Sequence, residues 1–341
     1  MTLSRILRAA AALAVMALGL SACGSQQAAP ASGGKDRSTS VVVGLTYIPN
    51  VQFAPAYVAV SEGIFANNGV DASVRHHGSD EGLFTALLAG EEDVVIASGD
   101  EAAVASTQGM DLVSIGSYYR DYPGTVIVRS DSPIQSLADL KGATIGIPGE
   151  YGSNWYATLA ALQGAGLTLA DVTVSSIGYT QQAALTQGDV DAVVGFSNND
   201  LVQMRLAGLD VRSIDLPDDA PLIGASIITT RAWAASHADE ARGVVASLGA
   251  AMEAIHQRPD AAIEATMAQT GTDSGAEAAA RAVLKATDPL WVDQSGSANT
   301  AQDLERWGMM ADFLRQINAV TTDIDVSAVV TNDYAPAPRS S

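Results

Sequence analysis

Hydrophobic and polar positions alternate in short blocks along residues 41–119, and these blocks predict strands and helices in turn. Runs rich in Val and Ile are typical of buried strands, whereas longer runs that end at Gly are typical of helices. One helix is expected over 53–69, closed by Gly69. Strands are expected at 41–47, 71–77, 93–98 and 111–119. This βαβαβαβ run predicts a parallel sheet covered by helices.

A second set of alternating strands and helices follows, and mostly helical segments come after residue 232. Its strands are expected at 124–130, 143–149, 172–178, 190–197, 211–216 and 222–231. The order predicts an α/β protein of two lobes, each a parallel-rich sheet flanked by helices. Two strands should cross between the lobes, near Tyr122–Thr125 and near Gly224–Ser226. Because ligands bind beyond the carboxyl ends of parallel strands, a ligand cleft is expected at this two-strand hinge.

The expected boundaries follow from the insertion of the second set into the first. Residues 41–123 and 226–330 should form lobe I, and residues 124–225 should form lobe II. The tail, residues 331–341, contains "YAPAPRSS", and we expect it to be disordered.

The first residues predict a lipoprotein. Arg5 and Arg8 precede an apolar stretch, 9–20, that is too short to span a bilayer. The segment "LSAC" that follows resembles a bacterial lipobox, which predicts a signal peptide over 1–22 and a lipid on Cys23. Residues 23–40 are small and polar, as in a flexible tether. The protein is therefore expected on the outer face of the cytoplasmic membrane or in the periplasm.

Composition narrows the possible chemistry. The formal net charge of −20 argues against a nucleic-acid partner, because nothing would offset phosphate repulsion. Cys23 is the only cysteine, so no disulfide is expected. His76 and His77 are adjacent in a strand pattern and should point to opposite faces, which disfavours a metal site. The sequence has no nucleophile elbow, phosphate loop or dinucleotide fingerprint, and we expect neither a metal nor a cofactor.

Four segments carry a resemblance to a known family over about residues 41–270: "YIPNVQFAPAYVAVSEGIF", "LFTALLAGEEDVVIASGDE", "SLADLKGATIGIPGEYGS" and "QGDVDAVVGF". In this order they resemble the solute-binding proteins of ABC importers, in the family shared by thiamine-pyrimidine and alkanesulfonate receptors. The resemblance implies a periplasmic-binding-protein fold (type II). It also implies a monomer that captures a small molecule by lobe closure and delivers it to a membrane permease.

The motifs "YIPN…FAP" and "GEYGS" look more like the thiamine-pyrimidine and riboflavin branch than the sulfonate or nitrate branch. The resemblance therefore favours a thiamine-pyrimidine precursor or a similar heteroaromatic ligand. A riboflavin receptor and an alkanesulfonate or nitrate receptor are the alternatives.

One alternative belongs to another class, an enzyme similar to the fungal synthase of thiamine pyrimidine. That synthase resembles this chain around "AGEEDVVIASGDEAAVA". Its cofactor-binding Lys aligns with Ala97 and its reacting His with Glu101, and its cysteine-rich iron motif has no counterpart. Lys141 lies in the "DLKG" turn, which is expected at the surface. We therefore predict that the protein is not an enzyme.

Candidate ligand-binding residues follow the predicted strands, at the edge where the cleft should lie. They are Tyr47, Asn50, Gln52, Phe53, Asp100, Tyr118, Gly149, Glu150, Tyr151, Gly152, Ser153, Trp155, Tyr179, Asn198 and Asn199.

The turn "GEYGSNW" is the densest of these positions. Gly149 and Gly152 allow a close approach of the backbone to a ligand. The helix that starts near Ser153 should point free N–H groups into the cleft. Glu150 would prefer a ligand that donates hydrogen bonds and would disfavour a sulfonate. Tyr151 and Trp155 could stack on a flat ring. Tyr47 and Phe53 lie at the carboxyl end of the first strand, where the cleft is expected.

Several candidates have a purely structural alternative. Asn50 and Asp100 could cap helices, and Glu150 could complement a helix dipole. Phe53 and Trp155 could pack in the core. The alternative for Asn198 and Asn199 is turn chemistry before a helix. Strand alternation lets only one of Tyr118 and Tyr119 face the cleft, and we favour Tyr118.

Overall fold

The computed structural model describes residues 40–46, 49–77, 81–217, 219–270 and 274–336. The expected signal peptide, the expected lipidation site Cys23, most of the tether and the candidate Tyr47 lie outside these residues. The described residues belong to one unit, Thr39–Ser341. They include no helix that is both long enough and apolar enough to span a membrane.

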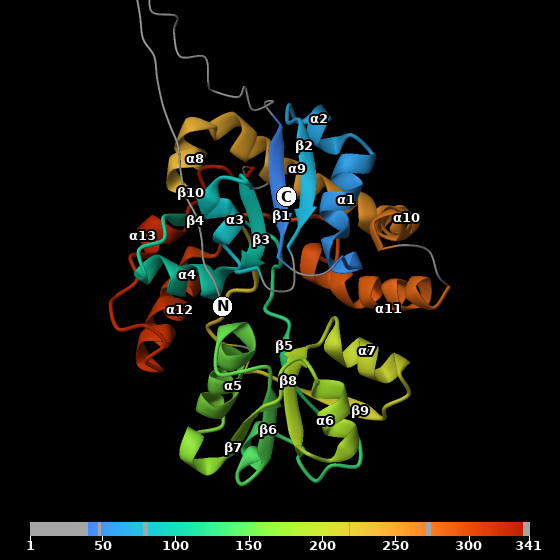
Figure 1. Cartoon of the computed structure of the whole chain (residues 1–341), viewed down its shortest axis with the longest axis vertical. Coiled ribbons are helices and arrows are strands. Elements are labelled where there is room, and N and C mark those ends of the chain that lie inside the picture. Colours follow the sequence, from blue (N-terminus) through green and yellow to red (C-terminus); the bar gives the residue numbers. More distant parts are fainter. Residues whose placement is uncertain (1–39, 47–48, 78–80, 218, 271–273, 337–341) are drawn as a thin grey trace, which may run out of the picture. The chain divides into compact units, whose positions relative to one another are not determined.

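The first sheet has five strands in the order β2-β1-β3-β10-β4 (Figure 1). Its strands are β1 (Val41–Leu45), β2 (Ala72–His76), β3 (Val94–Ser98), β4 (Leu112–Ser117) and β10 (Ala225–Thr230). Strand β1 pairs in parallel with β2 and β3, whereas β10 runs antiparallel between β3 and β4. The sheet is therefore mixed, because the last strand enters from the other lobe in the reverse direction.

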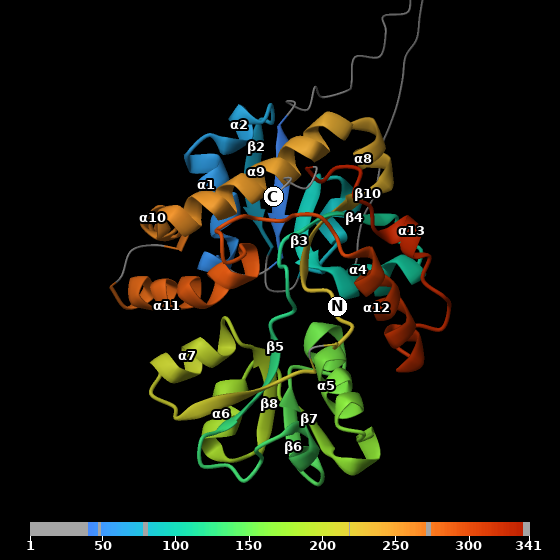
Figure 2. The same ribbon diagram turned by 180° about the vertical axis from the view of Figure 1, so that it is seen from behind.

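Helices cover both faces of the first sheet. One core cluster joins β1 and β3 to the helices α1 (Ala54–Ser61), α9 (Ala238–Gln257), α10 (Pro259–Thr270) and α11 (Ser274–Trp291). A smaller cluster packs α3 (Thr85–Ala89) and α4 (Gly99–Thr107) against the other face. Figure 2, the view from behind, shows α9 crossing in front of β1 and β3.

The helix predicted over 53–69 is wrong as a single element. It divides into η1 (Val51–Phe53), α1 and α2 (Ile64–Asn67). Gly63 has φ +67°, a left-handed conformation that breaks the helix between α1 and α2. The prediction that Gly69 ends the helical segment agrees with its φ of +78°.

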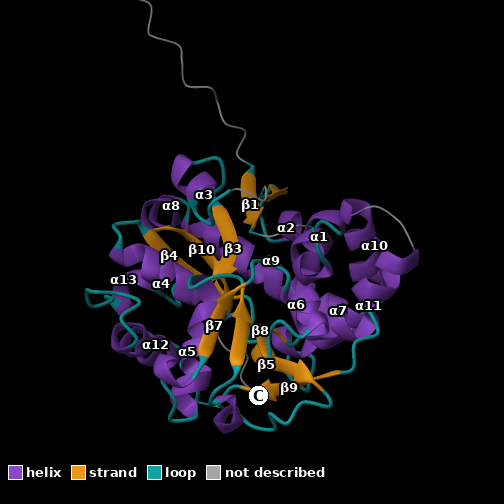
Figure 3. Ribbon diagram, turned by 60° about the horizontal axis from the view of Figure 1, so that its bottom comes forward, coloured by secondary structure: helices purple, strands orange, loops and turns teal. Residues whose placement is uncertain are grey.

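The second sheet repeats this arrangement with the order β7-β6-β8-β5-β9. Its strands are β5 (Gly124–Arg129), β6 (Thr144–Ile147), β7 (Thr173–Ser176), β8 (Ala192–Phe196) and β9 (Val211–Asp215). Strand β5 is antiparallel to β8 and β9, and β6 is parallel to β7 and β8. Helix α5 (Gly152–Gly164) packs on one face, and α6 (Gln181–Gln187) and α7 (Asp200–Leu206) pack on the other (Figure 3).

The chain passes between the sheets twice, from β4 to β5 and from β9 to β10. The protein thus has the two-lobed α/β fold that the alternating pattern predicts. Short helices complete the described chain: η2 (Leu137–Leu140), η3 (Leu169–Asp171), α8 (Arg231–Ser236), α12 (Leu304–Gln316) and α13 (Val326–Val329).

The expected boundaries imply that the last helices pack on lobe I alone, but the structure shows that they also contact lobe II. Trp307, Met310 and Phe313 of α12 share a core cluster with apolar residues of α5, β5 and β6 in lobe II. Arg306 also donates to the carbonyl oxygens of Ala220 and Leu222, on the segment between β9 and β10. Helix α12 therefore bridges the lobes by side-chain contacts, in addition to the two passages of the chain. The sequence pattern does not reveal this bridge.

The expected disorder of the tail is wrong for residues 331–336. The side chain of Asn332 accepts from the Gln302 amide at 2.7 Å and donates to the Gln302 carbonyl at 3.0 Å. The Thr331 amide donates to the Ser114 carbonyl at 3.0 Å. These hydrogen bonds hold the segment against β4 and against Gln302 despite its Pro-rich composition.

Candidate functional site

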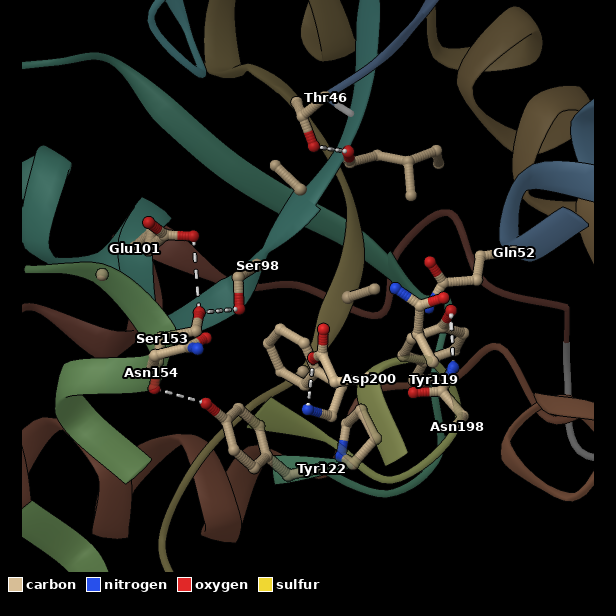
Figure 4. Close-up of a pocket in the computed structure, with 18 of the residues that line it drawn as sticks. Thr46, Gln52, Ser98, Glu101, Tyr119, Tyr122, Ser153, Asn154, Asn198 and Asp200 are labelled. Carbon is tan, nitrogen blue, oxygen red and sulfur yellow. Dashed lines mark hydrogen bonds between the residues drawn. The ribbon is translucent and has the colours of Figure 1, made fainter. Parts of the chain in front are cut away.

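A cavity of about 280 Å³ lies between the carboxyl ends of the two sheets, near the lower end of the ~300–1,000 Å³ usual for small-molecule pockets (Figure 4). Lobe I contributes Thr46, Gln52, Phe53, Leu83, Ile96, Ala97, Ser98, Glu101, Gly224 and Ala225. The segment between β4 and β5 contributes Tyr118, Tyr119, Tyr122 and Pro123. Lobe II contributes Pro148, Tyr151, Gly152, Ser153, Asn154, Tyr179, Gln181, Phe196, Asn198, Asn199 and Asp200.

Aromatic side chains form much of the wall. Tyr122 and Phe196 meet edge to face with ring centroids 6.3 Å apart, and Phe53 enters from lobe I. Tyr151 and Tyr179 belong to lobe II and are 62% and 77% exposed. Because exposed rings beside a cavity can fold over a flat ligand, this wall suits a planar aromatic molecule.

Two asparagine oxygens at the cavity have no hydrogen-bond partner among the described residues. They are Oδ1 of Asn198 and Oδ1 of Asn199, and both atoms are buried. The Nδ2 group of Asn198 donates to Oγ1 of Thr287, 3.1 Å away on α11 of lobe I. An unpaired buried acceptor is costly, so this pair favours a ligand that donates hydrogen bonds.

Two carboxyl groups meet one hydroxyl where α4 of lobe I faces α5 of lobe II. Oγ of Ser153 lies 3.0 Å from Oδ1 of Asp100, 3.4 Å from Oε2 of Glu101 and 2.9 Å from Oγ of Ser98. Figure 4 shows Glu101 and Ser98 on either side of Ser153. Burial raises the pKa of Asp100 to about 7, against the hydrogen bonds that it accepts. Burial and the nearby charge of Asp100 raise the pKa of Glu101 to about 8.

The lining is acidic and offers no positive charge. Of the described residues that line the cavity, none is Lys, Arg or His. Asp200 is a further buried carboxyl group; its Oδ2 accepts from the Phe196 amide at 2.7 Å, and burial raises its pKa. An anionic ligand would have to approach these carboxyl groups without a counter-charge, which is unfavourable.

The structure brings many of the predicted site residues together at this cavity. Those that line it are Gln52, Phe53, Tyr118, Tyr151, Gly152, Ser153, Tyr179, Asn198 and Asn199. The carboxyl ends of the strands supply most of them, as the topology rule requires.

Five of the predicted residues do not line the cavity. Asn50 caps η1, accepting from the Gln52 amide at 3.1 Å. Glu150 is exposed, and Trp155 packs against the core of lobe II. Asp100 is fully buried beneath the wall. Gly149 gives room to the ring of Tyr151, which a Cβ at this position would strike.

The choice between Tyr118 and Tyr119 was too strict, because both line the cavity. Tyr118 is one of the largest fully buried side chains, and its hydroxyl donates to the Gln52 carbonyl at 2.8 Å. Tyr119 is less buried and lies within 3.5 Å of Asn198, so it is the ring nearer to the unpaired acceptors. The strand ends at Ser117, so alternation no longer applies to the pair.

Glu101, Tyr122 and Asn154 line the cavity but were not among the predicted residues. Tyr122 donates to the Ser153 carbonyl at 2.7 Å, and Nδ2 of Asn154 donates to the Val194 carbonyl at 3.0 Å. The sequence held one usable signal for Glu101: it follows Asp100 at the same strand end. Tyr122 lies at a lobe crossing, where a hinge residue can reach both sides.

One cluster away from the cavity has the composition of a metal site. His77, Glu81 and Glu92 place ligand atoms within 4.8 Å of one another. Arg75 already contacts Glu92 at 2.7 Å and Glu81 at 2.9 Å, so its guanidinium supplies the positive charge there. His77 pairs with Glu92, whereas the neighbouring His76 contacts the Tyr57 hydroxyl. The cluster is better explained as a buried ion-pair network than as a metal site.

The two lobes and the cavity between them define a periplasmic-binding-protein fold. The crystal structure of the periplasmic aliphatic sulphonate binding protein SsuA from Escherichia coli matches with a TM-score of 0.70 and 19% identity. The match covers 86% of this chain and 92% of that one. At this identity the likeness establishes the fold alone.

Sequence comparison places the chain in a family. A family model described as "NMT1/THI5 like" matches residues 50–262. The riboflavin-binding protein RibY of Chloroflexus aurantiacus is 32% identical over 321 residues, 91% of this chain and 90% of that protein. The formylaminopyrimidine-binding protein of Halalkalibacterium halodurans is 25% identical over 173 residues, 50% of this chain and 52% of that protein. Other relatives, each matching less than half of this chain, are named 4-amino-5-hydroxymethyl-2-methylpyrimidine phosphate synthases. The chain belongs to the NMT1/THI5-like family.

Proposed function

We propose that this protein is the solute-binding component of an ABC importer, which captures riboflavin between its lobes and delivers it to the permease. The observation that carries the proposal is the cavity itself. Within the described part of the chain, it combines aromatic walls from both lobes, two buried acceptors without partners and a lining without cations. A ligand that contacts both lobes favours the closed form, which is the basis of capture by closure.

Riboflavin matches this chemistry at each point. Its flat ring system can stack on Tyr and Phe side chains. Its ring N–H and its hydroxyl groups are donors for Oδ1 of Asn198 and Oδ1 of Asn199, and it carries no charge that the acidic lining would repel. A relative that matches over nine-tenths of its length is a riboflavin-binding protein. We therefore place riboflavin ahead of the thiamine-pyrimidine precursor that the sequence motifs favour.

An aminopyrimidine remains the second candidate because its amino group can also donate to the two asparagine oxygens. The relative that binds formylaminopyrimidine supports this candidate, although the match spans half of each chain. A sulfonate or nitrate ligand is disfavoured by charge. Glu101 and Asp200 line the cavity, Asp100 is buried beside them, and the described lining contains no cation.

We infer that capture involves no reaction. The two positions that align with the reacting residues of the fungal synthase, Ala97 and Glu101, both line the cavity. A methyl group at Ala97 cannot form a Schiff base with a cofactor. Lys141 is exposed and pairs with Asp171 at 3.2 Å on lobe II, away from the lining.

The lipobox-like segment at 20–23 supports a proposed location for the protein. We propose that cleavage after residue 22 leaves a lipid on Cys23 and that residues 23–40 tether a monomer outside the cytoplasmic membrane. The permease would then meet the closed lobes at the membrane surface.

The test is a titration of the purified protein with riboflavin, followed by flavin fluorescence. Formylaminopyrimidine and an alkanesulfonate are titrated in parallel, and the ligand is recovered to check that it is unchanged. The variant Asn198→Leu should weaken riboflavin binding by about fivefold, the size of one buried hydrogen bond, about 1 kcal/mol. The same change at exposed Asn67 is the matched control and should have no effect. Tight binding of the sulfonate, or recovery of a converted flavin, would refute the proposal.

A further inference from the structure

The contact between α4 and α5 brings two buried carboxyl groups to one hydroxyl group. Oγ of Ser153 lies within hydrogen-bond reach of Oγ of Ser98, Oδ1 of Asp100 and Oε2 of Glu101. Ser98 and backbone amides also donate to Asp100, yet its buried Oδ2 has no hydrogen-bond partner among the described residues. If both carboxyl groups were ionised, two adjacent negative charges would be buried together, whereas a neutral acid can donate a hydrogen bond to its neighbour.

The surroundings do not supply a counter-charge. No cationic group has a hydrogen bond or ion pair with Asp100 or Glu101 among the contacts of the described residues. The ionisable groups that face the pair are Tyr156 of α5 and Tyr122 of the crossing segment, and burial raises the pKa of both tyrosines. Asp200 is the remaining carboxyl group at the cavity. On α12, the guanidinium of Arg306 binds backbone carbonyls instead.

The contact joins the two lobes. Ser153 begins α5 in lobe II, whereas Asp100 and Glu101 begin α4 in lobe I. Glu101 also lines the cavity, within reach of a bound ligand. Separation of α4 from α5 would let water replace Ser153 and hydrate both carboxyl groups, which favours their ionised forms.

We propose that Asp100 and Glu101 together retain at least one proton when the lobes are in contact, so that ligand capture takes up a proton from solution and is favoured by mild acid. The proposal rests on the proposed function, capture by lobe closure. The protonated pair of Asp100 and Glu101 would therefore stabilise the contact between the lobes as well as form part of the binding surface. We call this pair the proton-linked latch.

The sign of the effect follows from the burial of the pair. In the closed form the pKa of Asp100 rises to about 7 and that of Glu101 to about 8, whereas hydrated carboxyl groups titrate near pH 4. The closed form thus binds more protons than the open form between about pH 4 and about pH 8. Affinity should fall as the pH rises through this window, by up to tenfold per pH unit for one proton.

The experiment measures the dissociation constant for riboflavin from about pH 5 to about pH 8. In the wild-type protein the affinity should weaken by about three- to tenfold per unit of rising pH. Glu101→Gln replaces the acid by a neutral group of the same shape and should flatten the dependence, and Asp100→Asn should do the same. The matched control is Glu150→Gln, an exposed acid of lobe II that does not line the cavity, which should keep the wild-type slope.

The outcomes separate this inference from the proposed function. Binding with no pH dependence in the wild-type protein, or a slope that survives in both variants, overturns the latch but leaves riboflavin capture intact.

If riboflavin does not bind at any pH, the proposed function fails, and the latch is tested by thermal unfolding alone. Unfolding exposes both carboxyl groups, so the melting temperature should fall from about pH 5 to about pH 8, and less so in Glu101→Gln. Equal falls in wild type and Glu101→Gln overturn it.

Discussion

Gly152 has two structural roles: it starts α5 in a left-handed conformation, and its lack of a Cβ leaves room for the carboxyl group of Glu101. The variant Gly152→Ala perturbs both roles. Its φ is +68°, a conformation that costs an alanine about 1–2 kcal/mol. A Cβ at this position would also lie 2.8 Å from Oε1 of Glu101, closer than van der Waals contact allows. The carboxyl group must therefore move, and the space available to it is the cavity that it lines.

The matched control is Gly166→Ala, just beyond the other end of the same helix. Gly166 has φ +67°, and no atom lies within 4 Å of where its Cβ would be. Both variants should lose about 1–2 kcal/mol of unfolding free energy from backbone strain, which lowers the melting temperature by about 3–6 °C. Only Gly152→Ala should also weaken riboflavin binding, by about tenfold or ~1.4 kcal/mol, because its displaced carboxyl group enters the ligand space.

Thermal melts and riboflavin titrations of the two variants, side by side with the wild-type protein, check this prediction. Equal affinities in the two variants would show that Glu101 does not border the ligand. A much larger loss of stability in Gly152→Ala than in Gly166→Ala would show that the Glu101 side chain cannot move aside. This result would contradict its position at the wall of the cavity.

Three further predictions concern the folded state. Gly44→Ala should cost about 3–5 kcal/mol, because its Cβ would strike the buried carboxylate of Glu92 and separate it from Arg75 and from the ring of His77; urea unfolding measures the loss. Trp307→Ala should cost about 3–5 kcal/mol in the same assay, since the ring is fully buried in the core shared by both lobes. Gly308→Ala should raise the melting temperature by about 1–3 °C, because this helical site has open space and no positive φ; a lower value would contradict the packing described for α12.

The sequence alone determined the elements and the class of fold. The Val- and Ile-rich runs that become β1, β3, β5 and β8 are local signals, because burial on both faces of a sheet requires continuous apolar residues. The turns after these strands carry glycine, amide and aromatic residues, so the position of the cleft could also be predicted. Tyr151, Ser153 and Asn198, predicted in this way, line the cavity.

Which side chain of each turn faces the cavity was decided only by the tertiary structure. Tyr151 and Trp155 lie on the same turn and helix start, but Trp155 is partly buried against the core of lobe II instead of lining the cavity. Glu150 and Glu101 are both acids after a strand, yet only Glu101 meets the opposite lobe. Contacts such as Ser153 with Asp100, 53 residues apart, depend on how the lobes and α12 pack together. No local pattern encodes them, because they arise from long-range burial rather than from the period of a strand or a helix.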